Sequence, residues 1–208
     1  MNWADMTLRE FQAALASSSP TPGGGTASAV ALGQAASLSI MVCDLTLANE
    51  KWEEGWAIAE IIQTLAIPMM GRSNELATED STAFDRVMEG FGLPKTTDEE
   101  KSERRDAIRS ATLEAVVPFE TASLALELLT SLPELALEGN GNAVTDVGVA
   151  GLLASAAAKG AIFNVEINLD SLPEEMGQSI RKELPSLKEH TRIASRAVMD
   201  AVRERMGQ

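Results

Sequence analysis

Three consecutive glycines, Gly23–Gly25, mark the clearest candidate for a ligand loop. The stretch from Pro20 to Thr26 reads Pro-Thr-Pro-Gly-Gly-Gly-Thr and stands directly before a predicted helix. Glycine lets the backbone turn tightly and expose N–H groups, and the positive end of a helix dipole favours an anion or a polar carbonyl there. The loop lacks the Gly-Lys-Ser/Thr of a Walker A motif and the strand that a dinucleotide fold requires. A ligand loop and a purely structural turn both stay open. The candidate ligand residues are Thr21, Gly23, Gly24 and Gly25.

A second loop combines glycine with asparagine, and it also precedes a helix of small residues. It runs Gly139-Asn140-Gly141-Asn142-Ala143-Val144-Thr145-Asp146. Asn140 and Asn142 offer both donors and acceptors, and Asp146 lies in the first turn of an otherwise apolar helix. Asp and Thr also cap helices without any ligand, so capping is the alternative. Because apolar residues follow Asp146, we expect its carboxylate to be partly buried, where it needs a partner.

Asp80 and Lys95 lie on either side of a turn marked by two glycines and a proline. Asp80 belongs to the long helical stretch before this turn, where an isolated Asp is commonly a surface charge. Lys95 follows Leu93-Pro94, which holds it in an extended turn. Both side chains are of types that can transfer protons.

Four cations gather on the next helix of this acidic chain. Lys101, Arg105 and Arg109 are spaced by four residues and share one face, with Arg104 beside them. This face can meet the carboxylates of an acidic substrate. The alternative is a solvated helix, since neighbouring Glu and Asp residues can pair with each cation.

Several kinds of site are disfavoured by residue types. His190 is the only histidine and Cys43 the only cysteine, so zinc, di-iron and thiol-protease sites lack their residues. No nucleophile elbow supports a Ser-His-Asp triad. Cys43 cannot form an internal disulfide, and its apolar neighbours indicate a buried structural thiol. We therefore expect no metal site.

Composition and charge define the class of protein. The chain has 208 residues and a net charge of −14, which disfavours nucleic acid and anionic membranes as partners. The N-terminus lacks the features of a signal peptide. Residues 17–43 carry no charge, but their prolines, glycines and serines leave too little continuous apolar length for a membrane span. We expect a soluble, cytoplasmic protein.

Apolar periodicity predicts helices throughout the chain. Thr7 and Glu10 form a capping box for a first helix. Prolines are expected to kink or divide the later ones, at Pro68, Pro118, Pro133 and Pro185. Residues 163–169 alternate apolar and polar types and are expected to be extended or helical. The further expected helices span residues 26–48, 51–90, from 97 or 98, 145–161, and from beyond 173 to the C-terminus. Together they predict a single all-α domain, residues 1–208, folded as an up-and-down bundle with two inner helices rich in small residues.

In register across the chain, these segments resemble the formiminotransferase-cyclodeaminase family, specifically its C-terminal cyclodeaminase domain and free-standing cyclohydrolase relatives. The matching segments are Ser19–Gly25 with Met41–Thr46, Asp80–Met88, Leu93–Lys101, Gly139–Ala150 and Asn164–Leu169. They cover the chain from about residue 8 to 195. Thr26, Thr145 and Asp44 depart from the usual pattern, and Asp44 adds a charge near the loop.

The resemblance implies an all-α homodimer that acts on the one-carbon unit between N5 and N10 of tetrahydrofolate. The central motifs look closest to free-standing cyclohydrolases, which hydrolyse 5,10-methenyltetrahydrofolate to 10-formyltetrahydrofolate. The alternatives are a formiminotetrahydrofolate cyclodeaminase that releases ammonia, and a folate-binding or helical interaction protein without turnover. No cofactor is implied, because the folate is the substrate.

The same resemblance suggests roles for the candidate residues. Asp80 or Asp146 is assigned as the base or electrostatic group, and Lys95 to proton transfer or binding of the substrate tail. The glycine loop, Asn140, Asn142 and Asn164 are assigned to the polar edges of the folate. Arg105 and its neighbours are assigned to the glutamate tail.

Overall fold

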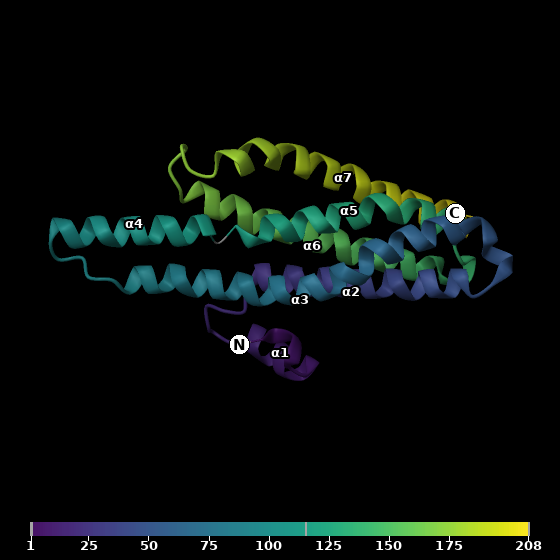
Figure 1. The fold of residues 1–208 in the computed structure, drawn as a ribbon, viewed down its shortest axis with the longest axis horizontal. Helices are drawn as coiled ribbons and strands as arrows, with labels where there is room; N and C mark the ends of the chain where they lie inside the picture. The colour runs from purple at the N-terminus through teal and green to yellow at the C-terminus, as the bar shows by residue number, and fades with distance from the viewer. Residues whose placement is uncertain (1, 115, 208) are drawn as a thin grey trace.

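The chain is all-helical, as predicted, in a computed structural model that describes residues 2–114 and 116–207 (Figure 1). Short 3-10 turns at Trp3–Asp5, Glu50–Gly55 and Gly141–Ala143 join or precede the helices. The helices are α1 Leu8–Leu15, α2 Gly24–Leu47, α3 Trp56–Gly92, α4 Asp98–Glu114, α5 Val117–Glu138, α6 Val144–Asp170 and α7 Gln178–Met206.

The long helices lie roughly side by side along one axis, and α4 and α5 follow each other along nearly the same line (Figure 1). Helix α3 and α4 form a hairpin that extends beyond the rest of the bundle, while the short α1 lies to one side. The inner helix α2 packs mainly on α3 and α6, and α5 packs on α6 and α7. The predicted bundle with two inner helices of small residues is therefore confirmed.

Small residues let the inner helices approach their neighbours closely. A Cβ atom added to Gly33 of α2 would lie 2.5 Å from the Ser73 hydroxyl of α3. A Cβ atom added to Gly160 of α6 would collide with the Ser28 hydroxyl of α2. The core around these crossings contains fully buried leucines and alanines, among them Leu32, Ala35, Leu128, Leu129, Ala154 and Ala157. Close backbone approach and tight apolar packing thus hold the bundle together.

Three of the prolines lie inside continuous helices, so the predicted division of the helices at these positions is wrong, while the kink that was the alternative stays a prediction. Pro68 does not divide α3, Pro133 does not break α5, and α7 continues through Pro185. Buried residues flank each proline, so tertiary packing keeps the helix together although one backbone hydrogen bond is lost. Only the interruption near Pro118 is confirmed, with this residue in the first turn of α5.

Helix α6 is longer than predicted and runs to Asp170. Residues 163–169 are helical, because Val165 and Leu169 lie four positions apart and bury the same face.

The predicted capping box is present, with Thr7 and Glu10 bonded to each other's backbone N–H groups. Cys43 is fully buried, and burial together with Asp44 raises the pKa of its thiol to about 12. The prediction of a buried, structural thiol is confirmed.

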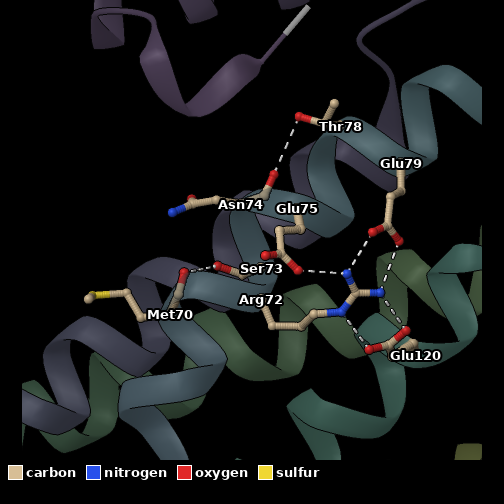
Figure 2. A network of polar contacts seen from close by, with 8 residues as sticks. All are labelled: Met70, Arg72, Ser73, Asn74, Glu75, Thr78, Glu79 and Glu120. Carbon is tan, nitrogen blue, oxygen red and sulfur yellow. Dashed lines mark hydrogen bonds and ion pairs between the residues drawn. The ribbon is translucent and has the colours of Figure 1, made fainter.

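An arginine surrounded by three carboxylates ties α5 to α3 (Figure 2). Arg72 binds Glu120 of α5 in two places, at 2.8 and 2.9 Å. It also contacts Glu79 at 2.6 and 2.9 Å and Glu75 at 2.9 Å. The guanidinium lowers the pKa of the Glu120 carboxyl. These bidentate Arg–carboxylate pairs hold the start of α5 beside the part of α3 that carries Asp80.

Three segments are long and apolar enough to cross a membrane when only length and composition are considered. They are Gly24–Leu47, a stretch within Asp98–Glu138, and Gly141–Asp170. In the most apolar part of α2, only 39% of the residues are buried inside the bundle, and in that of Gly141–Asp170 only 50% are. Both inner helices therefore expose considerable apolar surface in the single chain.

Candidate active site

Asp80 of α3 meets the glycine loop at the N-terminus of α2. The Thr26 hydroxyl donates a 2.9 Å hydrogen bond to Asp80 Oδ2. A Cβ atom on Gly25 would overlap the Asp80 carboxylate, so only glycine permits this approach. The two segments, far apart in sequence, thus form one polar site.

The environment of Asp80 makes its carboxylate more basic than one on the surface. Burial raises the pKa of the Asp80 carboxyl, and this effect exceeds the opposing influence of the Thr26 hydroxyl and backbone N–H. A carboxylate with a raised pKa accepts a proton more readily near neutral pH. The site can therefore provide a general base.

Asn164 of α6 completes this end of the bundle. Its Nδ2 donates a 2.8 Å hydrogen bond to the Gly160 carbonyl oxygen. A Cβ atom on Gly24 would lie 3.4 Å from the same nitrogen, so the Asn164 amide borders the glycine loop. Thr21 is fastened to α3 by a 3.1 Å bond from its hydroxyl to Asp85. The structure thus brings together Asp80, Asn164 and all the candidate loop residues, Thr21, Gly23, Gly24 and Gly25.

Asn140, Asn142 and Asp146 lie at the opposite end of the α2–α6 pair. The Asn140 backbone N–H donates to the Thr46 hydroxyl, and its side-chain amide donates to the Leu45 carbonyl oxygen. These partners lie at the C-terminus of α2, about 30 Å from Gly25 at a rise of about 1.5 Å per residue. Within one chain, these three residues do not join the Asp80 site.

Asn140 and Asp146 differ in what they do at this second end. The Asn140 side chain is engaged within the protein, since its Oδ1 also accepts a bond from the Asn142 N–H at 3.0 Å. Asp146 is half-buried, and no side-chain hydrogen bond caps α6. Among the residues that the structure describes, the Asp146 carboxylate makes no hydrogen bond or ion pair with another side chain. The capping interpretation of Asp146 therefore has no hydrogen bond to support it.

Two residues at this second end were missed by the sequence analysis. Arg205 of α7 lies 5.6 Å from the centre of the Trp52 ring and donates a 3.3 Å bond to the Gly139 carbonyl oxygen. Lys51 lies 4.5 Å from the same ring. Only the fold brings the C-terminal helix beside this loop, so no local signal could have identified Arg205.

Lys95 and Arg105 lie on the projecting α3–α4 hairpin. Lys95 is exposed in the turn beyond Gly92, and α3 rises about 18 Å between Asp80 and Gly92. Arg105 is exposed, bonds to Ser102 at 2.9 Å and lies 3.9 Å from Asp106. Lys101 and Arg109 also pair with acidic neighbours. The structure therefore favours a solvated helix for the cation face and does not bring Lys95 to Asp80 within one chain.

Asp80 also has a supporting hydrogen-bond network that the sequence analysis did not identify. The Trp3 indole donates to Ser81 at 2.8 Å, and the Ser81 and Thr26 hydroxyls are 2.9 Å apart. A separation of 78 residues between Trp3 and Ser81 left no local pattern to detect.

Among the described residues, no group of three or more His, Cys, Asp or Glu side chains could hold a metal ion.

Known proteins resemble this chain over nearly its whole length. It is 34% identical to the methenyltetrahydrofolate cyclohydrolase of Methylorubrum extorquens, over 96% of this chain and 97% of that protein. It is 32% identical to the formimidoyltransferase-cyclodeaminase of Mus musculus over 92% of this chain, which spans only 34% of the mouse protein. The crystal structure of formiminotetrahydrofolate cyclodeaminase from Thermotoga maritima superposes with a TM-score of 0.79 at 26% identity, covering 97% of this chain and 96% of that one.

The family profile agrees with these individual relatives. It matches residues 7–185, which include the glycine loop, Asp80, the Asn140–Asp146 segment and Asn164. The chain therefore belongs to the formiminotransferase-cyclodeaminase family.

Proposed function

We propose that this protein hydrolyses 5,10-methenyltetrahydrofolate to 10-formyltetrahydrofolate. The observation that carries the proposal is the end-to-end match to a free-standing relative named as a methenyltetrahydrofolate cyclohydrolase. The basic Asp80 carboxylate between the glycine loop and Asn164 supplies a group suited to that chemistry.

In the proposed reaction, Asp80 acts on the water that attacks the substrate. The substrate carries a cationic amidinium carbon between N5 and N10, which a nearby carboxylate stabilises electrostatically. Asp80 takes a proton from water as the oxygen bonds to this carbon, giving a neutral tetrahedral adduct. N5 then takes the proton held by Asp80, and the bond between that carbon and N5 breaks with its electron pair left on N5. The adduct hydroxyl loses its proton to solvent as the formyl C=O forms on N10. The net change adds one water and releases one proton.

The glycine loop and Asn164 are proposed to bind the polar edges of the folate, and no further cofactor is proposed. A hollow of about 590 Å³ on the α2, α3 and α6 surface offers room for part of it. Its lining includes Asn74, about 9 Å along α3 from Asp80. We keep the assignment of Lys95 and Arg105 to the substrate tail as a hypothesis that applies to the assembled protein.

A homodimer formed across the α2–α6 face is the proposed assembly. This face exposes apolar side chains on both helices, with Met41 38%, Leu45 44%, Val149 46% and Leu152 59% exposed. Its hollow is lined by Val30, Leu38 and Leu153. Residues 17–43 carry no charge, so the part of α2 before Asp44 brings no like-charge repulsion to a self-contact despite the acidic chain.

A two-fold axis that lies in the interface, perpendicular to α2 and α6 and through the middle of this face, would bring each end of the face against the opposite end of the partner's face. Helices α2 and α6 run antiparallel, because Gly24 borders Asn164 while Thr46 binds Asn140. The axis would therefore place Asn142 and Asp146 of the partner subunit near the glycine loop and Asp80. We propose that each active site is shared in this way and lies in the cytoplasm of a cell rather than at a membrane.

A cyclodeaminase is the second candidate function, because a solved structure that superposes on this chain is named as one. Two parallel assays separate the candidates. Loss of methenyltetrahydrofolate absorbance faster than in buffer, without ammonia from 5-formiminotetrahydrofolate, supports the cyclohydrolase. Ammonia release supports the cyclodeaminase. No activity in either assay, together with measurable folate affinity, indicates a binding protein that lacks turnover.

A further inference from the structure

A continuous chain of hydrogen bonds leads from the N-terminal segment to Asp80. It begins at the Trp3 indole nitrogen, passes through the Ser81 and Thr26 hydroxyls, and ends at Asp80 Oδ2. The three distances are 2.8, 2.9 and 2.9 Å. Trp3 is 9% exposed, Ser81 5% and Thr26 0%, so water has little access to compete for these bonds.

The donor and acceptor types of these side chains fix the direction of each hydrogen bond in the series. An indole N–H can only donate, so Ser81 accepts from Trp3. The single Thr26 hydroxyl proton points to Asp80, so Thr26 must accept from Ser81. Every donor therefore points toward the carboxylate, the arrangement that matches an ionised Asp80.

The charged groups around Asp80 are distant or already engaged. Helix α2 carries no charged residue before Asp44, and α6 presents the Asn164 amide. Asp5 of the N-terminal turn accepts a bond from Asn2. On α3 itself, Glu79 pairs with Arg72 and Asp85 accepts a bond from Thr21. The hydroxyl chain is thus the prominent polar influence on this carboxylate apart from the α2 backbone.

We propose that Trp3 is a positioning residue for Asp80, acting through Ser81 and Thr26 to orient the carboxylate and favour its ionised form. Trp3 itself touches no reacting atom. The N-terminal turn is held in place because the indole also packs edge-on against Phe11, with ring centres 6.3 Å apart. The inference rests on the proposed function only for its catalytic consequence, since the effect on Asp80 is a property of the free protein.

The test uses Trp3→Phe, which keeps an aromatic ring beside Phe11 and removes only the donor. The pKa of Asp80 is measured directly by carbon-13 NMR on protein labelled at aspartate, with Asp80→Asn identifying the signal. We expect this pKa to rise by about half a pH unit when the chain loses its first donor. Ser81→Ala should raise it at least as much. The pH profile of kcat/KM for methenyltetrahydrofolate should shift to higher pH on its acid side by the same amount.

Trp56→Phe is the matched control. Trp56 also donates its indole N–H, at 3.1 Å to the Thr46 carbonyl oxygen, but this bond ends at a backbone carbonyl and, among the described residues, belongs to no series of hydrogen bonds that reaches Asp80. This variant should leave the pKa of Asp80 unchanged. An unchanged pKa in a folded Trp3→Phe protein, or an equal shift in Trp56→Phe, would overturn the inference. A specific NMR shift in a protein that hydrolyses neither folate would support the positioning role while the proposed function fails.

Discussion

The two ends of the α2–α6 pair carry similar sequence features in different physical settings. Each end has a glycine-rich loop, a nearby Asp and at least one Asn. At the Gly25 end, Asp80 is held by Thr26 against a glycine backbone. At the Asn140 end, the Asn140 amide secures the loop, whereas Asp146 has no side-chain bond that caps its helix. One carboxylate is therefore held in place by a hydrogen bond within the single chain, and the other is half-buried without such a bond among the described residues.

Replacing the Asp80 carboxylate should have the largest effect. Asp80→Asn keeps an acceptor for the Thr26 hydroxyl but removes the base, so kcat/KM for methenyltetrahydrofolate should fall by roughly 10²- to 10⁴-fold. Asp200→Asn, an exposed α7 carboxylate paired with Arg196 and Arg203, is the control and should retain activity. A fully active Asp80→Asn enzyme would remove Asp80 from the mechanism.

Mixing two variants of reduced activity tests whether the two ends meet across a dimer. We expect Asp146→Asn to lower activity by about 10- to 100-fold, through lost charge at a shared site. Refolding it together with Asp80→Asn gives heterodimers with one intact and one doubly altered site. Activity should then recover to roughly a quarter of the wild-type value. No recovery in confirmed heterodimers would place both residues in one subunit's site or exclude Asp146.

Adding one methyl group should disturb the Gly25 end selectively. Gly25→Ala places a Cβ atom where the Asp80 carboxylate lies, so we expect a loss of about 1–3 kcal/mol in unfolding free energy and a lower kcat. Gly71→Ala is the control, because nothing lies within 4 Å of its added Cβ atom. It should be neutral or stabilise α3 by up to about 1 kcal/mol. Thermal unfolding and steady-state kinetics check both, and equal behaviour of the two would contradict the close approach.

The smallest expected effect is the pH dependence of stability. The pKa of Asp80 is raised in the folded protein, so the folded state binds more protons than the unfolded state between the two pKa values. Asp80 therefore opposes folding above its folded pKa, and this penalty disappears as pH falls. Any stabilisation by Asp80→Asn should be present at pH 7 and diminish toward pH 4.

Glu120→Gln should show the opposite sign. Arg72 lowers the pKa of Glu120, so its contribution to stability is present above the unfolded pKa and is lost as pH falls through the folded one. The destabilisation by Glu120→Gln should thus be greatest at neutral pH and small, because the pair is partly exposed. Melting temperatures measured from pH 3 to 7 compare both variants, and parallel trends would contradict the assigned pKa directions.

Local patterns predicted the elements well where the determining interactions are local. The Thr7–Glu10 capping box and the helical periodicity depend on residues three or four positions apart, and both are confirmed. The predicted division of helices at Pro133 and Pro185 was wrong, because flanking core contacts keep α5 and α7 continuous there. The Trp3–Ser81 bond could not be foreseen, since it depends on how the N-terminal turn docks on α3.

The sequence alone determined an all-helical chain, two helices of small residues and two glycine-rich loops at helix N-termini. These properties follow from residue type and short-range spacing. Only the tertiary structure decided that Asp80 joins the glycine loop while Asp146 lies at the other end of α6, about 27 Å along that helix from Asn164. The physical reason is that helices are rigid and α2 and α6 pack antiparallel, so side-by-side packing, rather than order in the chain, sets which polar residues meet.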